Sequence, residues 1–62
     1  MLFTVILPSS QDEAKKLVDE ARTLIEDKEY EQAVDKADLA VEKAPDYATA
    51  YSVRAEAEVW LE

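Results

Sequence analysis

The chain has 62 residues, and its 15 acidic and 7 basic side chains give a formal net charge of −8. This balance argues against nucleic acids and anionic membranes as partners, because their phosphates attract Lys and Arg. The sequence contains no Cys and no His, which excludes disulfides, thiolate sites and the commonest general base. The hydrophobic content of 48% is too high for a disordered acidic chain.

The chain begins with an apolar run that differs from everything after it. Residues 2–7 read Leu-Phe-Thr-Val-Ile-Leu, a composition typical of a short β-strand, and Pro8 ends the run. A signal peptide requires a basic region before its apolar run and a small-residue cleavage site after it, and this run has neither. It is also far shorter than the roughly 20 residues that span a bilayer. We therefore expect neither a signal nor an anchor, no membrane partner and a cytoplasmic location.

This predicted strand has no obvious partner within the chain. An unpaired buried strand leaves backbone donors and acceptors unsatisfied, and an exposed apolar strand is an adhesive edge. Antiparallel pairing with the same strand of a second chain would satisfy one edge of each strand. The alternative is a strap that folds back on the chain's own helices. We expect a homodimer or higher oligomer, with strand interface residues Leu2, Phe3, Thr4, Val5, Ile6 and Leu7.

The first predicted helix follows the strand directly. Ser10 is the expected N-cap, and Glu13, three residues later, completes a capping box. Apolar residues then recur at helical spacing from Ala14 to Ile25, which indicates one buried stripe. We therefore expect residues 1–8 to form a strand segment and residues 9–62 to form one helical domain.

Two more helices are predicted beyond a polar turn. An alanine-rich stripe extends from Tyr30 to Ala44, and Pro45 ends this second helix because proline lacks an amide donor. Asp46 is the expected N-cap of the third helix. That helix is apolar on two sides, so we expect one side to contact the preceding helix and the other to contact a second copy. The predicted interface residues are Val53, Ala57, Trp60 and Leu61.

An internal repeat relates the first and third helices. At a shift of 34 residues Leu17 aligns with Tyr51 and Ala21 with Ala55, and Pro45 closes the unit between them. This length and the small and bulky positions resemble the tetratricopeptide repeat, a helix–turn–helix unit. The resemblance covers residues 12–62, about one and a half repeats.

Several positions depart from the family pattern. Glu20 occupies a position where leucine is usual, and Ala37 replaces an aromatic residue. Ala21 and Ala55 replace the usual glycine. Lys28 stands in the turn between the first two helices, where glycine is common, and a left-handed conformation there would cost about 1 kcal/mol.

The resemblance implies a scaffold rather than an enzyme. In the family, stacked hairpins form a concave groove that holds a peptide or a helix of another protein. Some members clamp a terminal carboxylate with Lys and Asn, and only Arg22 could serve that purpose here, so we do not expect such binding. The positions that correspond to the groove are Val18, Arg22, Ile25, Ser52, Glu56 and Val59, with Trp60 beside them.

No catalytic, metal-binding or cofactor-binding residues are predicted. Asp35, Asp38 and Glu42 share one side of the second helix, but no Gly-rich loop or ligand cluster accompanies them, so we interpret them as a solvated face. The predicted function is a non-catalytic protein-interaction or self-assembly module. The joint absence of Gly, Cys, His and Asn also suits a designed protein without a natural substrate. The alternative is a truncated peptide-binding module from a longer helical array.

Overall fold

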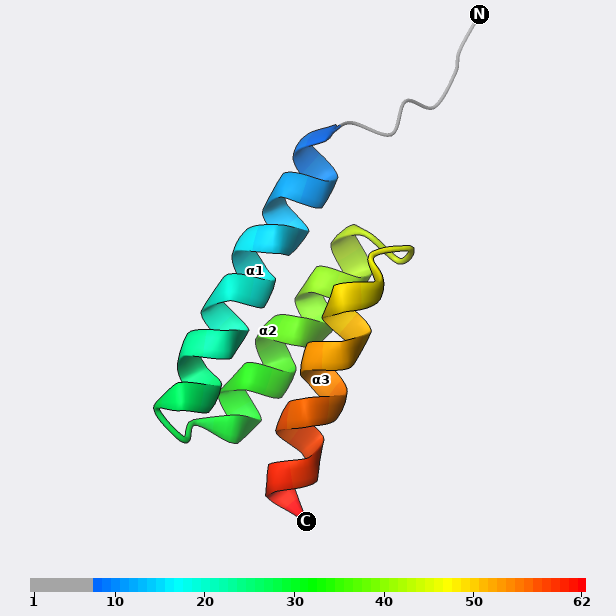
Figure 1. Cartoon of the computed structure of the whole chain (residues 1–62). Helices are drawn as coiled ribbons and strands as arrows, with labels where there is room; N and C mark the ends of the chain where they lie inside the picture. Colours follow the sequence, from blue (N-terminus) through cyan, green and yellow to red (C-terminus); the bar gives the residue numbers. More distant parts are fainter. Residues whose placement is uncertain (1–7) are drawn as a thin grey trace, which may run out of the picture.

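The computed structural model describes residues 8–62, which form three helices. These are α1 (Pro8–Glu26), α2 (Tyr30–Lys43) and α3 (Ala48–Leu61), and each runs antiparallel to the one before it (Figure 1). The predicted mainly α class with three antiparallel helices is confirmed for this part of the chain, which contains no strand. The predicted strand over Leu2–Leu7 lies outside the described residues.

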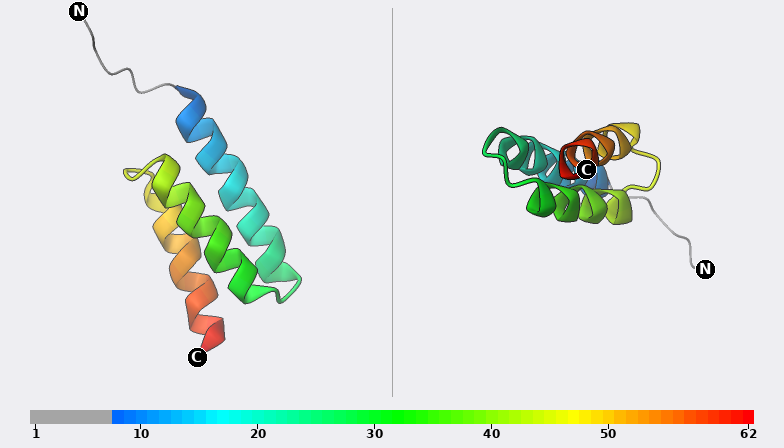
Figure 2. Two further views of the ribbon diagram at one scale, coloured as in Figure 1. Left: turned by 180° about the vertical axis from the view of Figure 1, so that it is seen from behind. Right: turned by 90° about the horizontal axis from the view of Figure 1, so that it is seen from below.

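The three helices are arranged in two layers. α2 contacts both other helices, and α1 and α3 lie beside each other on the same side of α2 (Figure 2). Short loops force this arrangement, because three or four residues allow the chain only to reverse direction. As a result α2 is the central element, and α1 and α3 each keep one side away from it.

Both predicted N-caps are wrong. α1 begins at Pro8, so Ser10 lies inside the first turn; proline suits that position because the first helical amides need no intrahelical acceptor. α3 begins at Ala48 after Tyr47, whose side chain makes no capping hydrogen bond. The Tyr47 amide donates to the Ala44 carbonyl at 2.9 Å, which makes Asp46 a central residue of a tight turn. Asp46 thus lies one residue before the N-cap position, which Tyr47 occupies.

The turn between α1 and α2 has Lys28 in a left-handed conformation, with φ of 66°. The Lys28 amide donates to the Ile25 carbonyl at 3.0 Å, and the Glu29 amide donates to the Leu24 carbonyl at 2.7 Å. These two hydrogen bonds form a Schellman motif, whose left-handed position favours glycine. The left-handed conformation considered for this lysine from the sequence is therefore present.

We expect Lys28→Gly to be neutral or stabilising, by up to about 1 kcal/mol in the free energy of unfolding. The gain comes from relief of the clash between Cβ and the backbone, and the greater entropy of glycine in the unfolded chain offsets part of it. Lys28→Ala is the matched control, because it removes the same charge but keeps Cβ. Urea denaturation should rank Gly above Ala by about 1 kcal/mol. A clear loss of stability in the glycine variant would contradict the assigned turn.

The core consists almost entirely of alanine. Among the residues whose side chains the structure describes, two valines and eight alanines are buried: Ala14, Val18, Ala21, Ala33, Ala37, Ala40, Ala44, Ala50, Val53 and Ala57. Larger apolar side chains surround this core and stay partly exposed, namely Leu17, Leu24, Ile25, Val34, Val41 and Tyr47. Small side chains let the helix backbones approach closely, so tight packing rather than a large apolar area holds the layers together.

Candidate functional site

The interface predicted on α3 is only partly available to a partner. Val53 is 2% exposed and Ala57 is fully buried, so both belong to the core within the chain and not to a docking surface. Trp60 does have a neighbour in the chain: its ring stacks on Tyr30 of α2, with centroids 5.7 Å apart and planes 12° from parallel. Trp60 nonetheless stays 59% exposed, and Leu61 stays 46% exposed. The expectation that this side of α3 has no intrachain neighbour is therefore wrong.

The predicted groove is realised in part. Arg22, Ile25 and Glu56 line one hollow of about 270 Å³ together with Glu26, between α1 and α3. Val18 is 2% exposed and lies in the core, so it cannot line a groove. Ser52 and Val59, also expected in the groove, are both exposed, although neither lines this hollow.

Sequence reasoning missed a different apolar surface, on the side of α3 that faces away from α2. Tyr51 is 40% exposed and Val59 is 64% exposed, which are high values for large apolar side chains in a small domain. Exposed small residues lie between them at helical spacing. We call this surface the free face of α3, and it consists of Ala48, Tyr51, Ser52, Ala55 and Val59.

The free face of α3 corresponds to a covered face of α1. The equivalent residues 34 positions earlier are all buried or partly buried in the core, and they are Ala14, Leu17, Val18, Ala21 and Ile25. α2 covers this face of α1, whereas no helix of residues 8–62 covers the free face of α3. The 34-residue shift in the sequence could have revealed this surface, because it pairs each exposed position with a buried one.

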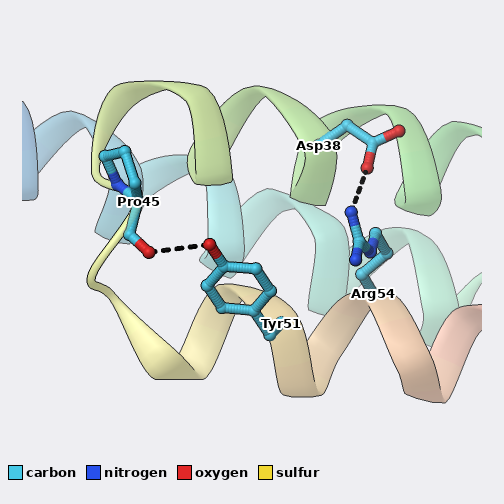
Figure 3. A network of polar contacts seen from close by, with 4 residues as sticks. All are labelled: Asp38, Pro45, Tyr51 and Arg54. Carbon is cyan, nitrogen blue, oxygen red and sulfur yellow. Dashed lines mark hydrogen bonds and ion pairs between the residues drawn. The ribbon is translucent and has the colours of Figure 1, made fainter.

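Polar contacts hold the free face of α3 in a defined orientation (Figure 3). The Tyr51 hydroxyl donates a hydrogen bond to the Pro45 carbonyl at 2.7 Å, which connects α3 to the turn before it. Arg54 Nη1 donates to Asp38 Oδ1 at 3.1 Å, and its guanidinium lies 5.6 Å from the Tyr51 ring centroid. Asp38 is thus a partly buried partner of α3, which corrects its place on a fully solvated face. Tyr51 is oriented before any partner binds.

We expect Tyr51→Phe to lower the free energy of unfolding by about 1 kcal/mol, the net contribution of one hydrogen bond. The Pro45 carbonyl would then depend on water in place of the hydroxyl. Tyr47→Phe is the matched control, because Tyr47 holds the same turn through its main-chain amide, and its effect should stay below about 0.5 kcal/mol. Urea titrations of the three chains measure the difference, and equal stability of all three would show that the hydroxyl does not support the turn.

Nothing in the described part of the chain points to bound metal or to a membrane span. Residues 8–62 contain no group of three or more candidate metal ligands. None of the three helices is long and apolar enough to cross a membrane. Within the same range, every buried side-chain nitrogen or oxygen has a hydrogen-bond partner.

Comparison with known proteins finds no matching family model, no similar curated protein and no similar solved structure. The arrangement of α1 and α3 on one side of α2 is consistent with a helical repeat. The specific resemblance to the tetratricopeptide repeat over residues 12–62 stays a prediction.

Proposed function

We propose that this protein is a non-catalytic protein-interaction module that assembles with copies of itself through the free face of α3. The observation that carries the proposal is a difference in burial between two equivalent faces. α2 covers the face on α1, whereas the equivalent face on α3 is exposed. Exposed apolar surface of this kind commonly marks a site of protein association.

The exposed side of α1, which lies at the other edge of the layer formed by α1 and α3, supports the same proposal. The face of α1 that corresponds to the buried side of α3 carries Lys16, Asp19 and Thr23, all exposed. A polar face there can remain in water without cost, so it does not require a further helix. Exposed apolar surface therefore gathers at the α3 side of the layer, and association should use that side.

Analytical ultracentrifugation over a wide range of protein concentrations tests the proposed assembly. We expect the full chain to show a mass above that of one chain, rising with concentration. Val59→Glu should return the mass to that of one chain, because it places a charge within the apolar contact. Leu39→Glu is the matched control: it adds the same charge at an exposed apolar residue of α2 and should leave assembly intact. A single-chain mass for the unmodified protein at every concentration would contradict the proposal.

Removal of residues 1–7 separates the two predicted means of association. Strand pairing through Leu2–Leu7 stays a prediction, and a shortened chain that begins at Pro8 keeps all three helices. If the shortened chain does not assemble but the full-length Val59→Glu chain still does, the association is due to the strand. Assembly that survives the deletion supports the free face of α3. A cytoplasmic location likewise stays a prediction from the sequence.

Peptide binding is a second candidate function, and the hollow between α1 and α3 is the observation that favours it. Arg22, Glu26 and Glu56 surround the partly buried Ile25 there, so a peptide could find an apolar contact with charges of both signs around it. Titration with short basic, acidic and apolar peptides, followed by the NMR shifts of these four residues, tests this function. Shift changes confined to the free face of α3 would count against it.

A further inference from the structure

We infer that the free face of α3 binds the same face of a second copy, with the two α3 helices antiparallel and Ala55 at the two-fold axis. This inference rests on the proposed function and specifies its partner and geometry. A two-fold interface must be self-complementary, so that when one residue contacts a second, the second also contacts the first in the other copy. The free face of α3 meets this condition.

The spacing of residues on the free face is symmetric about Ala55. Tyr51 and Val59 each lie four positions from Ala55, one before it and one after it. In an antiparallel pair centred on Ala55, Tyr51 of each copy lies opposite Val59 of the other. The smallest side chain then lies where the helices are closest, at an interaxial distance of about 8 Å, and the two large apolar residues fill the space on either side.

The distribution of charge on α3 favours the antiparallel direction. Its two carboxylates, Glu56 and Glu58, lie in the second half and Glu62 follows as the C-cap, whereas the first half contains the cation Arg54 and no carboxylate. The first turn of α3 has no acidic residue and no side-chain cap, so a further carboxylate near the positive end of its dipole would be favourable. Antiparallel pairing places Glu62 of the second copy near this end, beside Ala48. Parallel pairing would instead align the carboxylates of the two copies.

The expected association is weak. A single pair of helices buries less area than the roughly 1,200 Å² that stable complexes bury in total. Each chain also carries a net charge of −8, so the two copies repel one another at long range. The partner is nevertheless a second copy, because Tyr51 and Val59 lie symmetrically about Ala55 and the antiparallel register sets Glu56 opposite Arg54 of the other copy.

Single engineered cysteines test the geometry directly, because the chain contains no cysteine of its own. Ala55→Cys should form a disulfide-linked dimer under mild oxidation, since a disulfide needs Cα atoms about 4.4–6.8 Å apart. Ala48→Cys lies on the same face but should not cross-link: at 1.5 Å per residue, its Cα would lie about 21 Å from its counterpart in an antiparallel pair. Glu42→Cys, exposed on α2, reports the yield from random collision.

One further chain completes the test. A mixture of the Ala48→Cys and Glu62→Cys chains should give the mixed dimer well above the Glu42→Cys yield. Circular dichroism should show the same helix content in every variant, since all four sites are exposed. Equal cross-linking of Ala48→Cys and Ala55→Cys would overturn the antiparallel direction. If ultracentrifugation shows assembly while Ala55→Cys cross-links no more than Glu42→Cys, this result would overturn the geometry and leave the proposed function intact. A chain of single-chain mass throughout would overturn both.

Discussion

Replacing Ala37 with leucine is expected to destabilise the domain by about 3 kcal/mol, a large share of what a domain of this size can have. Ala37 is fully buried near the middle of α2, the helix that contacts both α1 and α3. Three extra carbon atoms have no space where the backbones approach through alanines, so α2 must move or leucine must adopt an unfavourable rotamer.

Ala48→Leu is the matched control for Ala37→Leu. It makes the same change at an exposed position of α3, and its effect should stay within about 0.5 kcal/mol. Urea denaturation of both variants, with the unmodified chain, measures the difference. If Ala37→Leu were as stable as the control, α2 would not pack against α1 and α3 with its alanines inward, and the fold described above would be wrong.

Replacing Val53 with alanine is expected to lower the free energy of unfolding by about 2 kcal/mol, because two methyl groups leave the core and a small cavity replaces them. Val59→Ala makes the identical change six residues later, and it should cost less than about 0.5 kcal/mol. The structure distinguishes these residues sharply, since Val53 is 2% exposed and Val59 is 64% exposed.

This pair of valines also decides which side of α3 is free. The measurement is urea denaturation at a protein concentration where ultracentrifugation shows single chains, so that assembly does not contribute. Equal losses at the two positions would mean that the orientation of α3 about its axis differs from the one described. The reverse order would restore Val53 to the interface that the sequence pattern predicts and would remove the basis for the free face.

Local sequence patterns predicted the elements of the fold well. The three helices of the described residues and the end of α2 before Pro45 follow from interactions between residues a few positions apart. The first residues of α1 and α3, Pro8 and Ala48, were not predicted correctly from the same local patterns. A capping side chain contributes only about 1 kcal/mol, so the hydrogen-bonded turn that contains Asp46 outweighed its capping preference.

The candidate site was predicted less well, and α3 shows why. This helix is apolar on two sides, and that pattern assigned Val53 to a partner, while the family resemblance assigned Val59 to a groove. Neither assignment matches the structure, in which Val53 lies in the core and Val59 does not line the hollow between α1 and α3. Three of the predicted groove residues, Arg22, Ile25 and Glu56, do line this hollow. Arg22 and Glu56 are equivalent positions of the 34-residue repeat, so their meeting agrees with the sequence prediction.

The sequence by itself determined three helices, the apolar stripes along them and the turns that reverse the chain. Those features depend on spacings of three and four residues and on the backbone preferences of single residues, which are local properties. Only the tertiary structure decided which side of α3 is buried. The rotation of a helix about its axis depends on contacts between residues far apart in the sequence. Here Ala50, Val53 and Ala57 pack in one core with the alanines of α2, which leaves Val59 outward.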